Sequence, residues 1–363
     1  MFRVLGFLTG GTSPKRSDVS KDDLHADTLG GADRALLELA SQRKAKGITR
    51  ELLKIHSRLA RLSDFQPGKE TNEIFSRLVS LCCEIHDTET VNKVFRDGMV
   101  QAILPPLRKM CSDAEYCLED HWAKHITAAP STDEAIGRLK SFTYYKNYED
   151  LTRHEICAML SAHPVLPGKV AFIGSGPLPL TSLCFLEALK KRALPGNRAD
   201  SENVRYPANQ SLIPEILNID RDGAAVESAS VMCAKLGSLG EGMKFQCAPA
   251  GGKALDLHGF DVVYIAALVG GSQNEKERLL HSVAAKMREG ALIIMRTSWG
   301  LRSCLYPEID MATEEMLQRV EICSVVHPYG SVVNSIIVAR IRSRPKPNGD
   351  TNGSIPLITS FAC

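Results

Sequence analysis

The sequence has no long hydrophobic stretch. Its 363 residues contain no run of about 18 consecutive apolar residues, the length that a helix needs to cross a membrane. The start, Met1 to Gly11, is mildly apolar but short. Lys15, Arg16 and Asp18 follow it, without the cleavage pattern of a signal peptide. We therefore expect no transmembrane helix and no membrane partner.

Charge of one sign and aromatic residues are also scarce. The chain has 44 basic and 42 acidic residues, a net charge of +2, and an aromatic content of 6%. A dedicated nucleic-acid binder usually shows a basic excess on one face, and proteins that hold single strands present rings on which bases stack. We therefore expect no nucleic-acid partner.

The eleven cysteines include no C-x-x-C pair. Structural zinc sites commonly carry such pairs, so the spacing predicts no metal site. Thiols that form neither a disulfide framework nor a zinc site are typical of a reducing compartment. The sequence therefore predicts free thiols and a cytoplasmic protein.

The hydrophobic fraction, 44%, is sufficient for a sizeable core, and the chain divides into four parts. Residues 1–32 and 343–363 are rich in small, polar and turn-forming residues and predict flexible ends. Residues 33–165 show helical spacing and predict an α-helical domain. Its apolar runs begin at Leu36, Leu52, Phe75 and Leu107.

Residues 166–342 alternate short apolar runs with helical stretches. Strands are expected at 169–173, 215–220, 261–266, 291–296 and 331–339, and helices at 180–193, 223–237, 275–288 and 312–319. This alternation predicts an α/β fold, with a mostly parallel sheet covered by helices on both faces. The second half is therefore expected to be Rossmann-like.

A glycine-rich turn follows the first expected strand. Gly174 and Gly176 allow a sharp turn and the close approach of a ligand to the main chain. Pro179 stands where a dinucleotide-binding G-x-G-x-x-G motif has its third glycine, and Pro177 also lacks an N–H donor. The turn therefore favours a nucleoside-like ligand with an amino-acid arm over a pyrophosphate.

Two further strand ends complete the expected cofactor site. Asp220 ends the second strand, where it can accept both ribose hydroxyls of an adenosine or cap the next helix. Ala266, Ala267 and Leu268 follow the next buried strand and leave room for a flat base. The cofactor-binding candidates are Gly174, Ser175, Gly176, Pro177, Leu178, Thr181, Asp220, Ala266, Ala267 and Leu268.

These motifs resemble those of nicotianamine synthases, with this chain as a fungal-type member. The residues that carry the resemblance are Gly-Ser-Gly-Pro-Leu-Pro-Leu-Thr at 174–181, the tyrosine-rich 142–148, and segments at 219–220, 266–270, 295–302, 305–307, 327–328 and 334–335. It covers about residues 70–341. It implies a class I S-adenosylmethionine-dependent transferase fold with an N-terminal helical domain.

The resemblance also implies an activity. Three molecules of S-adenosylmethionine condense into nicotianamine, a metallophore that chelates transition metals, and release methylthioadenosine. The 3-amino-3-carboxypropyl (aminobutyrate) arm is transferred, and no metal is required. The stretch 246–252 lacks the aspartate that plant members carry near Pro249, so the adenine contact departs from their pattern.

The reaction needs a carboxylate to take a proton from the attacking amine. Glu119 is the candidate, because the family has a helix-borne glutamate upstream of its tyrosine motif; Glu115 and Asp120 are the alternatives. Tyr144, Tyr145 and Tyr148 are candidates for contacts with the substrate's amino or carboxylate group, with Tyr145 and Tyr148 favoured.

Five other polar residues are interpreted as mainly structural. Asn147 is expected to cap a turn, and Arg153 and Arg296 to form ordinary ion pairs rather than to bind substrate carboxylates. Tyr306, together with His327, is expected to close the last strands. None of the five is assigned to the site.

Three other functions fit parts of the sequence. A small-molecule methyltransferase would use the same cofactor half. An aminobutyrate transferase with another acceptor would make a different metallophore. A binding module would keep the fold without the chemistry. The oligomeric state is left open.

Overall fold

The computed structural model describes residues 31–193, 214–267 and 269–343. The ends predicted to be flexible, 1–32 and 343–363, and the segment 194–213 lie almost entirely outside these ranges, as does Leu268. No helix within the described residues is long and apolar enough to cross a membrane.

A seven-stranded sheet forms the centre of the second half, in the order β3-β2-β1-β4-β5-β7-β6. The strands are β1 (Lys169–Ile173), β2 (Glu215–Asp220), β3 (Met243–Cys247), β4 (Val262–Ile265), β5 (Leu292–Thr297), β6 (Val320–Val326) and β7 (Ser335–Ile341). β1 to β5 pair in parallel, whereas β7 is antiparallel to β5 and β6. The predicted Rossmann-like, mostly parallel sheet is confirmed.

The two strands absent from the sequence prediction, β3 and β6, are the edges of the sheet. Their residues are mostly exposed or half-buried, whereas every residue of β4 and β5 is buried. Only strands covered on both faces need a continuous apolar run. Edge strands therefore lack the signal on which the prediction relied.

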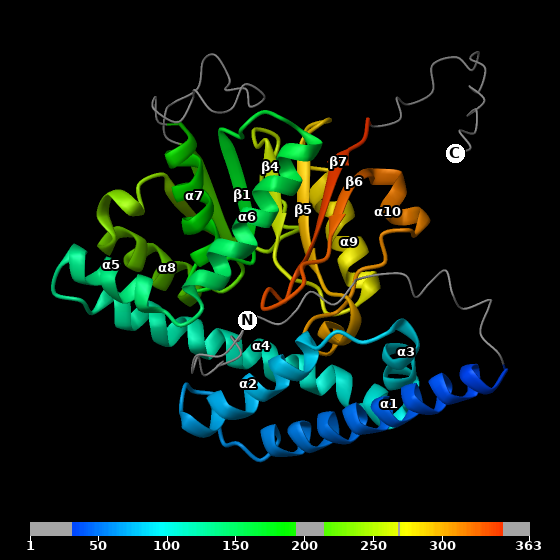
Figure 1. Cartoon of the computed structure of the whole chain (residues 1–363). Coiled ribbons are helices and arrows are strands. Elements are labelled where there is room, and N and C mark those ends of the chain that lie inside the picture. The colour runs from blue at the N-terminus through cyan, green and yellow to red at the C-terminus, as the bar shows by residue number, and fades with distance from the viewer. Residues whose placement is uncertain (1–30, 194–213, 268, 344–363) are drawn as a thin grey trace, which may run out of the picture.

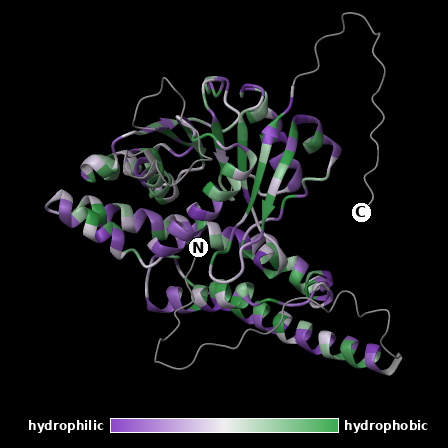
Figure 2. Ribbon diagram, turned by 45° about the horizontal axis from the view of Figure 1, so that its top comes forward, coloured by the Kyte–Doolittle hydropathy of each residue, from purple (hydrophilic) through white to green (hydrophobic). Residues whose placement is uncertain are grey.

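Helices cover both faces of this sheet (Figure 1). α6 (Tyr145–Ala162) and α7 (Leu180–Ala193) pack on one face, and α9 (Gln273–Ala284) and α10 (Glu314–Arg319) on the other. α8 (Gly223–Lys235) lies beside β3 and α4 (Gly98–Thr127). Figure 2 shows the resulting contrast, with predominantly hydrophobic strands between helices of mixed character.

The N-terminal helices lie below and to the left of the sheet in Figure 1. They are α1 (Gly31–Leu59), α2 (Lys69–Cys83), α3 (Thr88–Arg96), α4 and α5 (Thr132–Ser141). The first two predicted apolar runs are joined in the single helix α1, whose Leu36 and Leu37 are more than half exposed. The predicted helical character of this half is confirmed, but the separation of those two runs is wrong.

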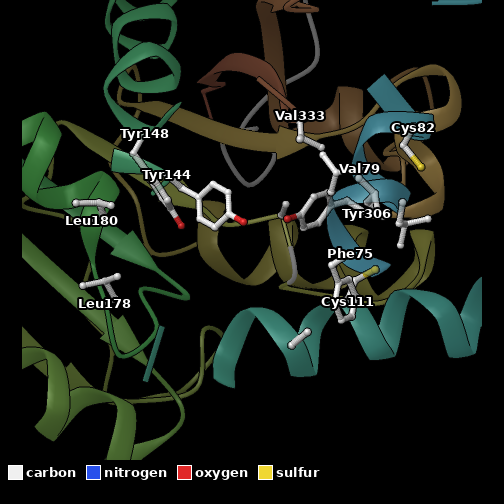
Figure 3. Packing of buried hydrophobic residues seen from close by; sticks show 14 of the residues in the cluster. Phe75, Val79, Cys82, Cys111, Tyr144, Tyr148, Leu178, Leu180, Tyr306 and Val333 are labelled. Atoms are coloured by element: carbon white, nitrogen blue, oxygen red, sulfur yellow. The ribbon is translucent and has the colours of Figure 1, made fainter. Parts of the chain in front are cut away.

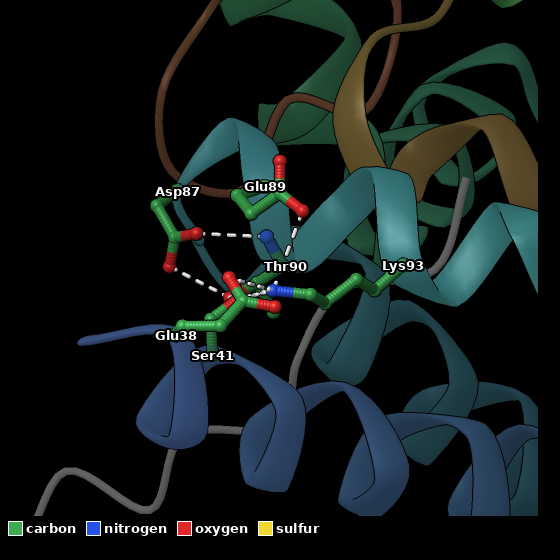
Figure 4. Close-up of polar contacts among 6 residues, drawn as sticks. All are labelled: Glu38, Ser41, Asp87, Glu89, Thr90 and Lys93. Atoms are coloured by element: carbon green, nitrogen blue, oxygen red, sulfur yellow. Dashed lines mark hydrogen bonds and ion pairs between the residues drawn. The ribbon is translucent and has the colours of Figure 1, made fainter. Parts of the chain in front are cut away.

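Polar contacts fix α3 against α1 (Figure 4). Asp87 caps α3 by accepting a hydrogen bond from the Thr90 N–H at 2.7 Å. The Thr90 hydroxyl lies 3.0 Å from that of Ser41 on α1. Lys93 Nζ bonds Glu38 Oε2 at 2.8 Å. Lys93 Nζ also donates to the Ser41 hydroxyl at 3.2 Å, so these polar contacts set the orientation of the two helices.

The two halves share one hydrophobic cluster, part of which Figure 3 shows. It joins Phe75 and Val79 of α2 to Leu178 and Leu180 beside the glycine turn. Figure 1 shows α4 crossing below the sheet between these parts. The boundary at 165/166 stays a prediction: α6 precedes it in sequence yet packs on the sheet.

Candidate functional site

A cavity of about 700 Å³ lies between α4 and the carboxyl ends of β1, β2 and β4. Carboxyl ends of parallel strands are where open α/β sheets bind ligands. Its wall combines the glycine turn with side chains of α4 and α6, so both halves of the chain contribute. Among the described residues, no group of three or more His, Cys, Asp or Glu side chains is arranged to hold a metal ion.

The glycine turn forms one wall of this cavity. Gly174 and Gly176 have φ angles of +79° and +65°, which L-residues with side chains rarely adopt. A Cβ atom at Gly174 would collide with Val269, and one at Gly176 with Glu119 Oε2. Both glycines are therefore required by the protein's own packing, and Gly176 brings Glu119 onto the turn.

Asp220 braces the glycine turn from the neighbouring strand. Its Oδ2 accepts a hydrogen bond from the Gly176 N–H at 2.9 Å, and its Oδ1 accepts one from the Asp222 N–H at 3.0 Å. The capping residue of α8 is Asp222, whose Oδ1 accepts from the Ala224 N–H at 3.0 Å. The helix-cap alternative for Asp220 is therefore wrong. Its carboxylate borders the cavity with acceptor capacity to spare for a diol.

Glu119 and Tyr148 join α4 to α6 across the cavity. The Tyr148 hydroxyl donates a hydrogen bond to Glu119 Oε1 at 3.2 Å. Burial and the neighbouring Glu115 carboxylate raise the pKa of Glu119 well above its usual range, although the hydrogen bond from Tyr148 lowers it. Burial and Glu119 likewise raise the pKa of Tyr148. The raised pKa makes the Glu119 carboxylate a stronger proton acceptor than an ordinary glutamate, and Tyr148 orients it.

A second pair of the same kind lies one helical turn away. Glu115 is 9% exposed and accepts a hydrogen bond at Oε2 from the Tyr306 hydroxyl at 3.0 Å. Burial and Glu115 raise the pKa of Tyr306 well above its usual range. Both residues border the cavity, so the purely structural interpretation of Tyr306 missed its place in the wall.

The other tyrosines of the motif lie away from this wall. Tyr144 packs edge-on against Phe142, and the Tyr145 hydroxyl donates to Glu187 Oε2 at 3.4 Å. Neither borders the cavity, nor does Asp120, which pairs with a lysine on the surface of α4 at 2.6 Å. Of the three tyrosines, the structure brings only Tyr148 to Glu119.

Asn147 has a structural contact. Its Nδ2 donates to the Ser331 carbonyl at 2.8 Å and so ties α6 to the loop that enters β7. The prediction that it caps a turn does not describe this long-range bond. His327 fits its structural interpretation, with Nδ1 lying 2.8 Å from the Ser335 hydroxyl.

Arg296 is buried at the cavity floor. Its Nε donates to Glu155 Oε1 at 2.7 Å, and its Nη2 donates to the Thr181 hydroxyl at 2.9 Å. Burial alone would lower the pKa of Arg296, but Glu155 raises it. Arg153 pairs with Asp150 on the surface, at 3.2 Å. Both arginines therefore form ion pairs within the protein.

The loop after β4 is held by a lysine that the sequence analysis did not single out. Ala266 and Ala267 border the cavity, and the buried Lys276 donates to the carbonyls of Ala267 and Val269 at 3.0 and 3.3 Å. Burial and the charge of Arg108 lower the pKa of Lys276 to about 8. Buried lysines are rare, and this one fixes the wall expected to face the base.

Not all of the remaining residues predicted to bind the cofactor border the cavity. Ser175, Leu178 and Thr181 border the cavity, whereas Pro177 does not. In the stretch that lacks the family's aspartate, only small side chains, those of Ala248 and Ala250, border it. The structure therefore offers no acidic side chain there for an adenine amino group.

Buried polar atoms beside the cavity lack partners within the described part of the chain. They are Ser175 Oγ, Ser182 Oγ and Asn334 Nδ2. Asn334 is 1% exposed. A buried donor without a partner is costly, so such atoms indicate where a polar ligand completes the structure.

The cavity wall carries more acidic than basic side chains and therefore favours a positively charged ligand. The described lining residues include six carboxylates, those of Asp113, Glu115, Glu119, Asp220, Asp222 and Glu275. They include two guanidinium groups, those of Arg221 and Arg296, and the latter is already paired with Glu155. Such a site attracts a ligand that carries positive charge, as a sulfonium with an ammonium group does.

The motifs, the fold and this cavity agree with a match to known proteins. A family model described as "Nicotianamine synthase protein" matches residues 41–345, which is most of the chain. The chain belongs to the nicotianamine synthase family. The family suggested by the sequence motifs is thereby confirmed.

Relatives within the nicotianamine synthase family match over nearly their whole length. Nicotianamine synthase 2 of Oryza sativa subsp. japonica is 31% identical over 88% of this chain and 91% of its own. Nicotianamine synthase of Solanum lycopersicum is 30% identical over 87% and 90%. The alignments therefore cover most of this chain and most of each plant relative.

Solved structures of MtNAS have the same fold. A mutant of MtNAS in complex with S-adenosylmethionine superposes with a TM-score of 0.62 at 19% identity, covering 81% of this chain and 98% of that one. MtNAS in complex with MTA and tNA gives the same TM-score at 18% identity, covering 82% and 98%. The predicted transferase fold, Rossmann-like with an N-terminal helical part, is confirmed.

Proposed function

We propose that this protein is a nicotianamine synthase in activity as well as in family. It transfers the aminobutyrate arm of S-adenosylmethionine to an amine, releases methylthioadenosine, and condenses three molecules into nicotianamine. The observation that carries the proposal is the contact of Glu119 with both Tyr148 and the glycine turn. This contact puts a proton acceptor where the reacting arm of a nucleoside bound on that turn must lie.

The nucleoside would lie along the strand ends. Asp220 would accept the ribose hydroxyls, and the small side chains of Ala266 and Ala267 would leave room for the adenine. The turn at Gly174 and Gly176 would allow the methionyl arm to approach the main chain closely. The unpartnered hydroxyl of Ser175 supports a polar ligand at this point.

The chemistry requires a base and the correct alignment of the two reacting molecules. The amine nitrogen attacks the γ-carbon of the arm, the carbon–sulfur bond breaks, and its electron pair remains on sulfur in methylthioadenosine. The proton released by the amine passes to Glu119, whose other oxygen is oriented by Tyr148. Because an α-amine titrates at about 8, a carboxylate of raised pKa takes its proton readily. Alignment of the two reacting molecules supplies further acceleration.

The test is an incubation of the purified protein with S-adenosylmethionine alone, followed by mass spectrometry. We expect methylthioadenosine and an azetidine-containing product. S-adenosylhomocysteine instead would identify a methyltransferase and overturn the proposal. A shorter or different aminobutyrate adduct would indicate another acceptor and hence another metallophore.

Two variants sharpen this test. Glu119→Gln should lower the rate of methylthioadenosine release by about 10²–10⁴-fold, the usual contribution of a general base. Asp120→Asn removes the same charge from the next residue of α4, outside the cavity, and should change the rate less than about twofold. Equal losses in both variants would contradict the assignment.

The cellular role follows from the product. Nicotianamine chelates transition metals, so the proposed role is metal homeostasis through a metallophore, in the cytoplasm. The ten cysteines that the structure describes are all free thiols, which supports a reducing compartment. We retain the division into a helical part, 33–165, and a nucleoside-binding part, 166–342, as two units that share this cavity.

A further inference from the structure

Lys276 is a buried charged residue behind the cavity that the chemistry above does not use. It lies near the start of α9 and is 4% exposed. Its Nζ donates hydrogen bonds to the main-chain carbonyls of Ala267, at 3.0 Å, and of Val269, at 3.3 Å. Lysines are almost never fully buried unless they are paired, and these two acceptors carry no formal charge. The burial of this ammonium group therefore needs a reason.

Both carbonyls belong to residues 266–267 and 269–271, the β4 loop, which follows β4 and leads into α9. These residues all border the cavity, on the side where the adenine is proposed to lie. Lys276 is not among the residues that line the cavity, so its ammonium group lies behind the loop rather than in the binding space. The lysine therefore acts on a ligand through the shape of this loop.

The β4 loop packs directly on the glycine turn. A Cβ atom at Gly174 would collide with Val269 Cγ2 and would lie 3.3 Å from the Cβ of Ala266. The Ala266 N–H also donates to the Ile173 carbonyl, at 3.0 Å, one residue before the turn. Because Lys276 holds the carbonyl of Val269, it also fixes the place at which the loop meets the turn. One ammonium group thus positions two adjoining parts of the proposed nucleoside site.

The main chain of the β4 loop passes so close to Lys276 that it requires a glycine. Gly270 has a φ angle of +85°, and a Cβ atom there would lie 2.9 Å from Lys276 Cγ and 3.3 Å from its backbone nitrogen. Glycine adopts such a conformation without steric cost. At the next residue, the Gly271 N–H donates to Glu275 Oε2 at 2.7 Å. The start of α9 therefore shapes the loop through its main chain and through two side chains.

The charge of Lys276 lowers the stability of the folded protein. Burial and the charge of Arg108 on α4 lower the pKa of Lys276 to about 8, although Glu275 opposes this shift. A lysine whose pKa is lower in the folded protein than in the unfolded chain destabilises the fold while it carries its proton. This loss of stability is complete below about pH 8 and disappears as the pH rises toward the ordinary value of 10.5. A local cost of this kind is typical of residues that serve a functional site.

From this arrangement we propose that Lys276 is a positioning residue for the nucleoside. Its ammonium group holds the β4 loop against the glycine turn, in the shape that binds the adenosine part of the ligand. In the reaction proposed above, on which this inference rests, that ligand is S-adenosylmethionine before the transfer and methylthioadenosine after it. Because Lys276 lies behind the wall, it takes no part in the proton transfer. The protein keeps this charge for binding, at a cost in stability.

The test removes the ammonium group and uses methylthioadenosine as the probe. This nucleoside lacks the amino-acid head group, so its binding reports on the adenosine part of the site alone. Lys276→Met keeps an unbranched apolar side chain and loses both hydrogen bonds. The matched control is Arg278→Met, which removes a positive charge from an exposed position of the same helix. Calorimetric titrations with the probe and urea unfolding are measured on the full-length proteins.

We expect Lys276→Met to weaken methylthioadenosine binding about tenfold, the loss that follows removal of a hydrogen bond to a charged group. The same variant should unfold at an equal or higher urea concentration, because the buried charge is gone. Arg278→Met should bind within about twofold of the wild type. Unchanged binding in Lys276→Met would overturn the proposal. Weaker binding together with a lower urea midpoint would also overturn it, because the lysine would then serve the fold.

The pH dependence of binding tests the charge itself. The affinity of the wild type for methylthioadenosine should fall about threefold to tenfold between about pH 7 and pH 9, because a neutral amine makes weaker hydrogen bonds than an ammonium group. The charged groups that act on Lys276, Arg108 and Glu275, belong to residue types that do not titrate in this interval. Lys276→Met should show no such fall. A wild type without the fall, or a variant that retains it, would contradict the role of the charge.

The results for Lys276 are separable from those for the proposed function. If the wild-type protein releases no methylthioadenosine from S-adenosylmethionine, the proposed activity fails, whereas the titrations still test the lysine. If the enzyme is active and Lys276→Met binds the probe like the wild type, only the role of Lys276 fails. In an active enzyme, Lys276→Met should raise the KM for S-adenosylmethionine about tenfold and change kcat less than about threefold. A wild type that binds no methylthioadenosine would overturn both proposals.

Discussion

The Tyr148 hydroxyl lies 3.2 Å from Glu119 Oε1, so a residue at the start of α6 orients a carboxylate on α4. Tyr145, three residues earlier, bonds Glu187 outside the cavity. The same motif therefore holds one tyrosine in the wall and one away from it.

Removal of single hydroxyls should separate these two tyrosines. Tyr148→Phe should lower kcat for methylthioadenosine release by about 10–100-fold, because it removes a hydrogen bond to a charged group. Tyr145→Phe should stay within about twofold, since its partner lies away from the cavity. Steady-state assays on both variants check this, and a larger loss for Tyr145→Phe would contradict the placement.

The activity should depend on pH through Glu119. Its raised pKa means that the carboxyl is protonated, and inactive as a base, at pH values where an ordinary glutamate is ionised. Activity should therefore fall as the pH drops through this raised pKa. The groups that face it are Glu115 and Asp220, which raise the pKa, and Tyr148, which lowers it.

Glu115→Gln removes one of the charges that raise this pKa, so the acid limb of the kcat profile should move to lower pH. Profiles of the wild type and the variant, measured at saturating substrate, check the direction. A limb that stays in place or moves to higher pH would show that Glu115 does not act on Glu119.

Gly176 should tolerate no side chain. Gly176→Ala places a Cβ at positive φ, which costs about 1–2 kcal/mol, and against Glu119 Oε2. We expect at least a tenfold loss of S-adenosylmethionine affinity. Gly137→Ala is the matched control: Gly137 lies inside α5 with nothing within 4 Å of an added Cβ. It should stabilise the protein by about 0.5–1 kcal/mol in urea unfolding and leave binding unchanged.

The buried ion pair below the cavity should matter for stability. Glu155 and Arg296 are 0% and 4% exposed and lie 2.7 Å apart. Glu155→Gln leaves the guanidinium without a counter-charge and should lower the free energy of unfolding by about 3–5 kcal/mol. Arg153→Gln breaks an exposed pair with Asp150 and should cost less than about 1 kcal/mol. Urea titrations of both variants check the difference, and similar losses would contradict the role of burial.

Parts of the fold with strong periodicity were predictable from the sequence. The wholly buried strands β4 and β5 and the amphipathic helix α2 carry their signal locally, because burial on both faces or on one stripe fixes the residue pattern. The edge strands β3 and β6 were missed, because solvent on one side relaxes that pattern. The union of two helical runs in α1 was missed because a polar stretch that includes Gly47 interrupts the apolar spacing between them.

The site also contains some residues that local sequence predicts and others that only the tertiary structure brings together. The glycine turn and Asp220 follow from local sequence, because positive φ angles and strand ends impose particular residue types. The bond between Glu115 and Tyr306 joins residues 191 positions apart. No local pattern reports such a pair.

The sequence by itself determined the family, the α/β half with its nucleoside-binding turn, and the helical half before it, because these depend on periodicity and on residues with special backbone freedom. Only the tertiary structure decided which carboxylates and tyrosines face one another. It placed Tyr148 on Glu119 and Tyr306 on Glu115, and it left the amide nitrogen Nδ2 of Asn334 without a hydrogen-bond partner in the described part of the chain. The physical reason is that hydrogen bonding and desolvation depend on distances between side chains that only the packing of the two halves fixes.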